Sequence, residues 1–302
     1  MRVGVITGGT SAEREISIKT GIEMMKNLDK NKYKAIEIQI NNRRDLIDKL
    51  LKENIDFALI ALHGKFGEDG EAQEILESLN IPYSGSGILA SSLCMDKDIS
   101  KRLMKAEGIP TPEWIAIKKH QELNYELINR IGYPVVVKPV NGGSSLGTYI
   151  VKNSDDIVDA VLKAFSYDEE IIIEKYIRGR EITCSILSGK LLPIIEIKPY
   201  SEFFDYRAKY DDKASEEIVI ELDEELKCKV GNICRKCWSL FKCSVYGRID
   251  MIIKDNEPYV LEVNTLPGMT KNSLLPKSAK SYGLSFTELL NSIIELSLKI
   301  NR

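Results

Sequence analysis

The chain of 302 residues lacks the features that mark several large classes of protein. It has no long basic block and no stripe of basic and aromatic residues, and its formal net charge is −3, so nucleic acid is not an expected partner. The longest notable uncharged stretch, residues 79–95, contains Asn80, Pro82 and two glycines, which rules it out as a membrane helix. No internal repeat is apparent, and the N-terminus opens on a strand-like run rather than a signal peptide. We therefore expect a cytoplasmic protein that does not bind membranes.

Several common nucleotide-binding motifs are also missing. The glycine loop at residues 7–13 is not GxGxxG, and the loop at residues 141–148 lacks GK[ST]. Neither HRD nor DFG occurs. These absences exclude a dinucleotide fingerprint, a Walker A loop and protein-kinase chemistry.

The six cysteines do not by themselves indicate a metal site. Cys234 and Cys237 form a CxxC, with Cys228 and Cys243 nearby. Apolar residues over 226–241 follow the i, i+3, i+4 spacing of an amphipathic helix, and Cys234 and Cys237 fall on its apolar stripe. We interpret these two as core residues, where a free thiol packs as a small hydrophobic group. A zinc or redox site is the alternative, and disulfides are not expected in the cytosol.

The order of predicted elements divides the chain into three parts. Strand-like runs at 3–7, 34–40 and 57–62 alternate with helix-like runs at 12–27, 44–53 and 71–79, which predicts a parallel sheet. The Gly- and Ser-rich residues 81–95 lead to a helix at 96–107, a strand–glycine loop–strand at 134–151, a helix at 155–165 and a strand at 171–177. From Arg180 onward the pattern predicts antiparallel hairpins. The expected boundaries are 1–95, 96–179 and 180–302.

The most informative segment lies near the C-terminus. In a strand, residues two apart point the same way, so Glu262 and Asn264 should share one face while Leu261 and Val263 share the other. The run at 248–253 is also strand-like, and residues 254–258 between the two runs are typical of a turn.

Folding these runs as a hairpin places Asp250 opposite Glu262. Like charges in that position destabilise a sheet unless a cation lies between them. Carboxylate and amide oxygens suit magnesium that is held jointly with the phosphates of a nucleotide. The alternative is a polar hairpin that faces solvent.

Two glycine loops are candidates for binding anions. Residues 7–13 join the first strand to the first helix and place Glu13 in its first turn, which is either an anion site or a simple cap. Residues 141–148 form a Gly- and Ser-rich hairpin that can close over phosphates with its backbone N–H groups. Lys138 ends a strand of three valines, where it either meets an anion or reaches out to solvent.

Residues 171–181 run from an apolar strand into an acidic, basic and aromatic edge. Such a segment can line an adenine slot, with Glu181 accepting hydrogen bonds from ribose hydroxyls. Ordinary strand ends often have the same pattern.

Seven motifs, in this order along nearly the whole chain, resemble those of the ATP-grasp superfamily and, within it, the D-alanine–D-alanine ligases. They are residues 8–15, 63–70, 95–97, 138–147, 206–210, 247–250 and 262–270. The resemblance implies an α/β ATP-grasp fold. Residues 1–95 would form a Rossmann-like, parallel α/β substrate domain. Residues 96–179, with the glycine loop, and 180–302, with the metal site, would be two α+β units gripping ATP.

The resemblance also implies an activity. ATP phosphorylates the carboxylate of one D-alanine, the amine of a second D-alanine attacks the acyl phosphate, and the dipeptide feeds peptidoglycan synthesis. The partners would be two D-alanine molecules, ATP and two Mg²⁺ (or Mn²⁺) ions, and the enzyme would be a homodimer.

Individual roles follow from the same resemblance. ATP would be held by Lys97, Lys138, Ser145, Glu174, Lys175, Ile177 and Glu181, with Phe203 and Leu261 near the adenine. The metal ions would be bound by Asp250, Glu262 and Asn264. The first D-alanine would meet Glu13 and His63, and the carboxylate of the second would meet Ser273 and Leu274. Arg248 and the N–H of Gly268 would stabilise the oxyanion, Lys209 would cover the phosphate, and Glu13, Ser144 and Tyr210 would form a hydrogen-bond network.

The chain departs from the family pattern after Tyr210. Residues 211–218 lack the usual longer loop with a Pro-Ala pair, which predicts a shorter or more mobile lid. Leu266 before Pro267 is a smaller difference that should alter only packing.

Two alternatives remain. The first is a D-alanine–D-lactate or D-alanine–D-serine ligase. Tyr210 argues against lactate, because the lactate-using relatives carry histidine there. The second is a nucleotide-binding regulatory protein without turnover, which would not need the full set of charged residues.

Overall fold

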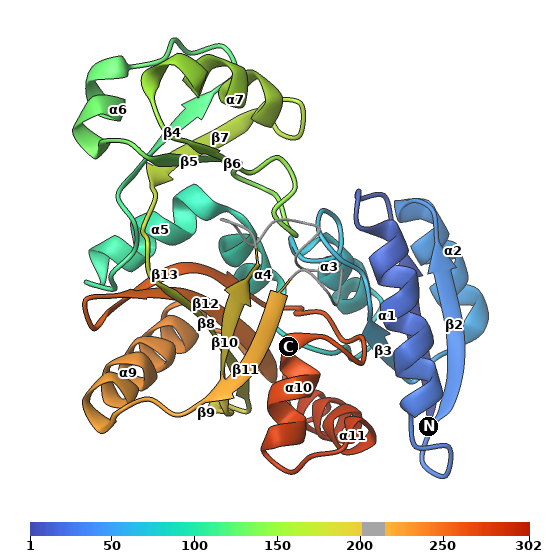
Figure 1. Cartoon of the computed structure of the whole chain (residues 1–302). Coiled ribbons are helices and arrows are strands. Elements are labelled where there is room, and N and C mark those ends of the chain that lie inside the picture. The colour runs from blue at the N-terminus through green and yellow to red at the C-terminus, as the bar shows by residue number, and fades with distance from the viewer. Residues whose placement is uncertain (201–214) are drawn as a thin grey trace.

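The computed structural model describes residues 1–200 and 215–302. Phe203, Lys209 and Tyr210, which were predicted to lie in the site, are outside the described residues. The described part contains three β-sheets with helices packed around them (Figure 1). The predicted α/β class is confirmed.

The first sheet is parallel, as the alternating pattern predicts, and has the strand order β2-β1-β3. Its strands are β1 (Arg2–Gly8), β2 (Lys34–Ile40) and β3 (Phe57–Ile60), and the helices of this unit are α1 (Arg14–Asn27), α2 (Arg43–Glu53) and α3 (Glu71–Ser78). The central strand β1 is buried almost throughout, which agrees with its nearly continuous apolar sequence.

Two consecutive helices follow, of which only the second was predicted. Residues 81–95, expected to be a Gly- and Ser-rich connection, contain α4 (Ile88–Met95). The side chain of Asp96 then caps α5 (Lys97–Ala106) by accepting a hydrogen bond from the backbone N–H of Ile99 at 2.8 Å. Because α4 carries no charged residue and no clear apolar stripe, periodicity does not reveal it.

The second sheet is antiparallel and has the strand order β4-β7-β5-β6. Its strands are β4 (Trp114–Lys118), β5 (Val135–Pro139), β6 (Tyr149–Val151) and β7 (Glu170–Lys175). Helices α6 (Tyr125–Ile131) and α7 (Ile157–Ala164), the latter preceded by the short helix η1 (Ser154–Asp156), share a hydrophobic core with this sheet. The glycine loop connects β5 to β6, as predicted.

The third sheet has the order β11-β10-β8-β12-β13, with β9 paired to β8. Its antiparallel strands are β8 (Arg180–Leu187), β9 (Lys190–Leu191), β10 (Ile194–Pro199), β11 (Ser215–Ile220), β12 (Tyr246–Lys254) and β13 (Glu257–Asn264). Helix α9 (Glu224–Leu240) packs on it and buries Cys234 and Cys237 in the shared core, where the helical spacing placed them.

The β12–β13 hairpin turns at Asp255 and Asn256, which both have positive φ (51° and 59°), as a tight two-residue hairpin turn requires. Asp250 pairs with Glu262 in the register, as predicted. The register then shifts, because Met251 pairs with Val260 and leaves Leu261 as an extra residue in β13.

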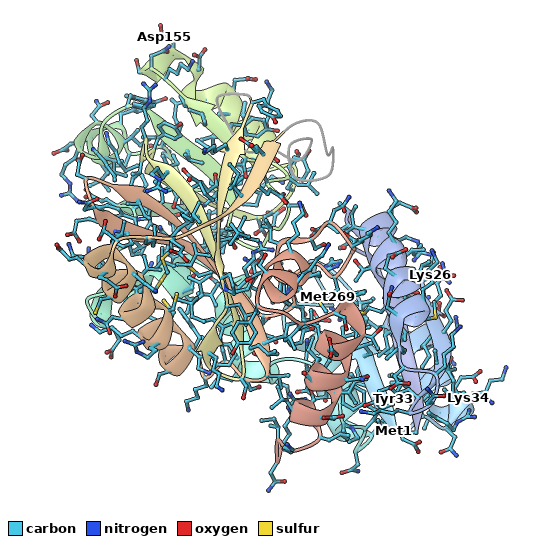
Figure 2. All side chains as sticks on the ribbon, turned by 60° about the horizontal axis from the view of Figure 1, so that its bottom comes forward. Met1, Lys26, Tyr33, Lys34, Asp155 and Met269 are labelled. Carbon is cyan, nitrogen blue, oxygen red and sulfur yellow. The ribbon has the colours of Figure 1, made fainter. Side chains whose placement is uncertain are left out.

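The first and last parts of the chain share one hydrophobic core. This core combines β1 and β3 with α10 (Leu274–Ser281) and α11 (Phe286–Ser297). Met269, labelled in Figure 2, belongs to the same core and is fully buried. The segment that leads from the third sheet to α10 is therefore held against the first sheet. None of the helices within the described ranges combines the length and the apolar character that crossing a membrane requires.

Candidate active site

The larger of two adjoining cavities, of about 440 Å³, lies between the second and third sheets. All of the predicted nucleotide-binding residues within the described ranges line it: Lys97, Lys138, Ser145, Glu174, Lys175, Ile177, Glu181 and Leu261. Apolar and charged side chains therefore face one another across a space between two sheets, which is the usual character of a ligand site.

The smaller cavity, of about 100 Å³, lies between the first α/β unit and the third sheet. The remaining predicted residues within the described ranges line it: Glu13, His63, Ser144, Arg248, Asp250, Glu262, Asn264, Gly268, Ser273 and Leu274. Glu181, Asp250 and Glu262 line both cavities, so ligands in the two cavities would meet beside these three carboxylates.

Asp250 lies at the centre of a polar cluster on the third sheet. The guanidinium of Arg248 donates two hydrogen bonds to its carboxylate, at 2.9 and 2.8 Å. The hydroxyl of Thr183 donates another at 2.7 Å, and the amide of Asn264 donates one at 3.1 Å. Residues 248 and 250 can pair in this way because alternate residues of β12 project from the same face.

The donor set at this position fits a hard divalent cation. Asp250 and Glu262 are register partners, and Asn264 follows on the same side of β13. Two carboxylates and an amide leave coordination positions for phosphate oxygens and water, as magnesium sites that are shared with nucleotides do. Within the described ranges, no cluster of three or more His, Cys, Asp or Glu side chains forms a protein-only metal cage.

The β-bulge changes the predicted faces of β13. Val260 and Val263 are buried in the core, whereas Leu261 lines the larger cavity beside Glu262. The expectation that Leu261 would share a face with Val263 is therefore wrong. The extra residue at the bulge interrupts the alternation, so that two consecutive side chains face the cavity.

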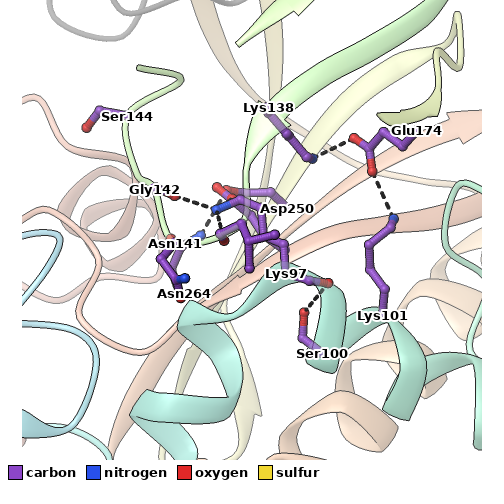
Figure 3. Close-up of polar contacts among 12 residues, drawn as sticks. Lys97, Ser100, Lys101, Lys138, Asn141, Gly142, Ser144, Glu174, Asp250 and Asn264 are labelled. Atoms are coloured by element: carbon purple, nitrogen blue, oxygen red, sulfur yellow. Dashed lines mark hydrogen bonds and ion pairs between the residues drawn. The ribbon is translucent and has the colours of Figure 1, made fainter. Parts of the chain in front are cut away.

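Lys97 connects the two sheets beside the carboxylates. Its ammonium donates hydrogen bonds to the carbonyls of Val140, at 3.5 Å, and Gly142, and lies 3.9 Å from the Glu262 carboxylate. Figure 3 shows it between the glycine loop and Asp250. This position places a positive charge where the phosphates of a nucleotide would pass from one cavity to the next.

Glu174 lies between two lysines (Figure 3). Its carboxylate oxygens lie 2.5 Å from the ammonium of Lys138 and 2.9 Å from that of Lys101. Burial alone would raise the pKa of Glu174, but the two ammonium groups hold it below its ordinary value. The carboxylate is therefore ionised at neutral pH.

The glycine loop reaches across to the first α/β unit. The Ser144 hydroxyl donates a hydrogen bond to the carboxylate of Glu13, a contact that the resemblance implied. Ser144 and Ser145 have φ of 51° and 56°, a strained backbone for non-glycine residues. A Cβ on Gly143 would lie 2.8 Å from the Glu13 carboxylate, so glycine allows the close approach.

Glu13 and His63 form the other end of the smaller cavity. Glu13 occupies the N-cap position of α1, where its side chain makes no capping hydrogen bond, and it is buried. The ring of His63 is fixed on both sides, with Nε2 3.1 Å from the Thr20 hydroxyl and Nδ1 3.1 Å from the Glu68 carboxylate. This end of the cavity presents the carboxylate of Glu13, which suits a substrate ammonium.

The N-terminus of α10 faces the smaller cavity from the opposite side. Ser273 is its N-cap residue, and its hydroxyl accepts a hydrogen bond from the backbone N–H of Thr270 at 3.0 Å. Leu274 packs against Ile195 and Ile197. The positive end of a helix dipole favours an anion, so a substrate carboxylate suits this end.

Several residues near the site were not predicted: Glu68, Lys101, Thr183, Glu217 and Lys277. Thr183 faces Asp250 because the two are register partners between β8 and β12. Glu217 lines the smaller cavity and forms an ion pair with Lys277 of α10. Only Lys101 had a usable signal, since it follows Lys97 by one helical turn. The other contacts join segments far apart in the sequence.

Comparisons with known proteins cover nearly the whole chain. The family model described as D-ala D-ala ligase C-terminus matches residues 103–295, and the D-ala D-ala ligase N-terminus model matches residues 2–50 and 43–86. A D-alanine–D-alanine ligase of Bacillus anthracis is 55% identical over 302 residues, which is 100% of this chain and 99% of the relative.

Solved structures of such ligases have the same fold as this chain. A crystal structure of the Bacillus anthracis D-alanine–D-alanine ligase complexed with ATP has a TM-score of 0.90 and 52% identity, and covers 99% of this chain and 98% of that one. The VanG D-Ala:D-Ser ligase of Enterococcus faecalis has a TM-score of 0.82 and 31% identity, with 98% and 99% covered. The chain belongs to the D-alanine–D-alanine ligase family.

Proposed function

We propose that the protein joins two D-alanine molecules into D-alanyl-D-alanine, a peptidoglycan precursor, with release of ADP and phosphate. One observation carries the proposal: the nucleotide-sized cavity and the small polar cavity share Asp250 and Glu262. A γ-phosphoryl group at this junction lies next to a carboxylate in the smaller cavity. Transfer between the two cavities gives an acyl phosphate, which the second amine attacks.

In this proposal, ATP lies in the larger cavity. Leu261 and Ile177 provide apolar walls for the base, and Glu181 is available to the ribose. Lys97, Lys138 and the backbone of the loop around Ser145 bind the phosphates. This arrangement supplies positioning and charge neutralisation, which are the main requirements of phosphoryl transfer.

Asp250, Glu262 and Asn264 would hold two Mg²⁺ or Mn²⁺ ions. When bound, such ions would offset the negative charge of the phosphates during transfer. Arg248 orients Asp250 through two hydrogen bonds and keeps a guanidinium at the junction.

The smaller cavity would bind both amino acids. The Glu13 carboxylate, beside His63, takes the ammonium of the first D-alanine, and the N-terminus of α10 at Ser273 and Leu274 takes the carboxylate of the second. Arg248 and the backbone N–H of Gly268 are donors for the oxyanion of the tetrahedral intermediate. We assign Lys209, Tyr210 and Phe203 their family roles from sequence alone: covering the phosphate, completing the network with Glu13 and Ser144, and packing near the adenine.

Three further points rest on the family resemblance. We propose that the protein works in the cytoplasm as a homodimer. Light scattering of the purified protein tests the dimer. We also propose that residues 1–95, 96–179 and 180–302 are its structural units, and limited proteolysis should cut near these boundaries.

The activity is tested by phosphate release from ATP with D-alanine, L-alanine, D-lactate and D-serine, singly and in pairs, together with identification of the products. D-alanine alone should give phosphate and D-alanyl-D-alanine, and L-alanine should give neither. Preferred formation of a mixed product with D-serine or D-lactate would move the assignment to the alternative ligases. Binding of ATP without turnover would indicate a regulatory protein.

A further inference from the structure

Lys101 lies in an unusual place for a lysine. Its side chain is 0% exposed, on a helix whose other face meets solvent. The ammonium lies 2.9 Å from the Glu174 carboxylate and donates a hydrogen bond of 2.7 Å to the Thr111 hydroxyl. It also lies 5.2 Å from the centre of the Trp114 ring, a distance at which a cation is attracted to the ring face. An ion so fully withdrawn from water needs a compensating interaction.

The partners of Lys101 lie on different elements and hold it in one position. Thr111 in turn donates a hydrogen bond to the carbonyl of Val260 at 2.8 Å, which connects the group to β13. Trp114 and Glu174 are register partners between β4 and β7. Lys101 therefore joins α5 to the second sheet and, through Thr111, to the third.

Lys101 reaches the nucleotide cavity only through Glu174. Glu174 and Lys138 both line the larger cavity, whereas Lys101 is not among the described residues that line either cavity. The Glu174 carboxylate lies between the two ammonium groups, 2.5 Å from Lys138. Figure 3 shows this chain of three side chains, with Lys138 to the left of Glu174 and Lys101 below it.

The charges of this group do not cancel. Two lysines and one glutamate leave a net charge of +1 in a region of low water content. With Lys138 alone, Glu174 would form a neutral pair and reduce the attraction of Lys138 for an anion. With Lys101 present, the carboxylate is already offset, and the charge of Lys138 remains available to a phosphate.

We propose that Lys101 is a positioning residue that offsets the charge of Glu174 and so keeps Lys138 electrostatically available to the phosphates of the nucleotide. The inference rests on the proposed function, because it needs ATP in the larger cavity. In agreement with it, burial lowers the pKa of Lys101 only to about 8, so the side chain is mostly charged at neutral pH.

The test compares equilibrium binding of ATP and of adenosine to the full-length protein and to Lys101→Met. Loss of the buried charge should weaken ATP binding by about tenfold, roughly the value of one charge-assisted contact. Adenosine has no phosphate, so its affinity should stay within twofold. In steady-state assays, the KM for ATP should rise while the KM for D-alanine is unchanged.

Lys105→Met is the matched control. Lys105 lies one turn further along α5, is exposed, and contacts the same Trp114 ring at 5.8 Å. The Lys105→Met variant should bind ATP as the parent does. Lys101→Arg keeps the charge and should restore ATP binding relative to Lys101→Met. If Lys101→Met does not fold, Lys101→Gln, which keeps a donor toward Glu174 without the charge, must show the ATP-selective loss.

The outcomes separate this inference from the proposed function. Equal losses for ATP and adenosine, or no loss for ATP, overturn the role of Lys101 while leaving the ligase assignment intact. A parent protein that binds no ATP overturns the proposed function itself.

Discussion

Glu262→Gln should abolish most ligase activity and leave the fold intact. The substitution keeps the size of the side chain and removes one of the three carboxylates that the cavities share. Loss of a charged metal ligand should cost several kcal/mol of transition-state stabilisation. Since 1.36 kcal/mol is tenfold in rate, we expect kcat/KM to fall by about 10²–10³-fold.

The effect on stability should be much smaller. Glu262 lies 3.9 Å from Lys97, and its side chain is 22% exposed, so that ion pair contributes about 0–1 kcal/mol. Removing one of two facing carboxylates also relieves repulsion between Asp250 and Glu262. The free energy of unfolding should therefore change by less than about 1 kcal/mol.

The assay is phosphate release across a magnesium titration, with chemical denaturation in parallel. Glu257→Gln is the control, because Glu257 begins the same strand and its side chain, which pairs with Lys229 at 2.7 Å, is largely exposed. That variant should keep parental activity. Near-parental turnover of Glu262→Gln at saturating magnesium would refute the metal assignment, and a loss of stability that matches the loss of activity would refute the catalytic explanation.

Three other predictions follow from the structure. Ser144→Gly should lower kcat by about tenfold or more through loss of the contact with Glu13, while slightly raising stability, because glycine tolerates the positive φ at this position; an unchanged kcat would remove Ser144 from the network. Glu174→Gln should destabilise the protein by about 3 kcal/mol at pH 7, because two lysines lose a buried carboxylate. The depressed pKa of Glu174 adds stability above its ordinary value of 4.5, and this contribution is lost as the pH falls through the folded-state pKa. Denaturation from pH 7 to pH 3 should therefore show the gap between parent and variant closing on the acid side, and a constant gap would contradict the charge argument. Cys237→Ala should cost about 1–2 kcal/mol of stability without affecting turnover, because the thiol is a buried core group; loss of activity or of bound zinc would favour a metal site instead.

The sequence predicted best where chemistry and local periodicity agree. The hairpin that carries Asp250 and Glu262 combines a turn signal with residues of alternating character, and its register is the predicted one. The parallel first sheet follows from regular alternation of strands and helices. The residues assigned by resemblance lie together around the two cavities wherever they are described, although their catalytic roles stay predictions.

Positions that depend on tertiary contacts could not be predicted from the sequence. Lys101 follows Lys97 by one helical turn, but its burial could not be predicted, since that burial depends on Glu174 and Trp114, which lie on the second sheet. Helix α4 is apolar without a repeating stripe, and it packs against α3, α5 and β13. In both cases the local sequence contains no information about which segments pack against the residue or the helix.

The bulge in β13 shows how a departure from local periodicity can serve the site. A regular strand would alternate core and cavity residues, so Leu261 would turn away from the nucleotide cavity whenever Glu262 faced it. The extra residue places both side chains on the cavity, while Val260 and Val263 on either side stay in the core. In the proposed function, one strand thereby provides an apolar wall for the base and, at the next residue, a carboxylate near the phosphates. Deletion of Leu261 would restore the alternation and leave Glu262 opposite Asp250 and Val260 opposite Met251. The cavity would then keep the carboxylate of Glu262 and lose the apolar side chain beside it.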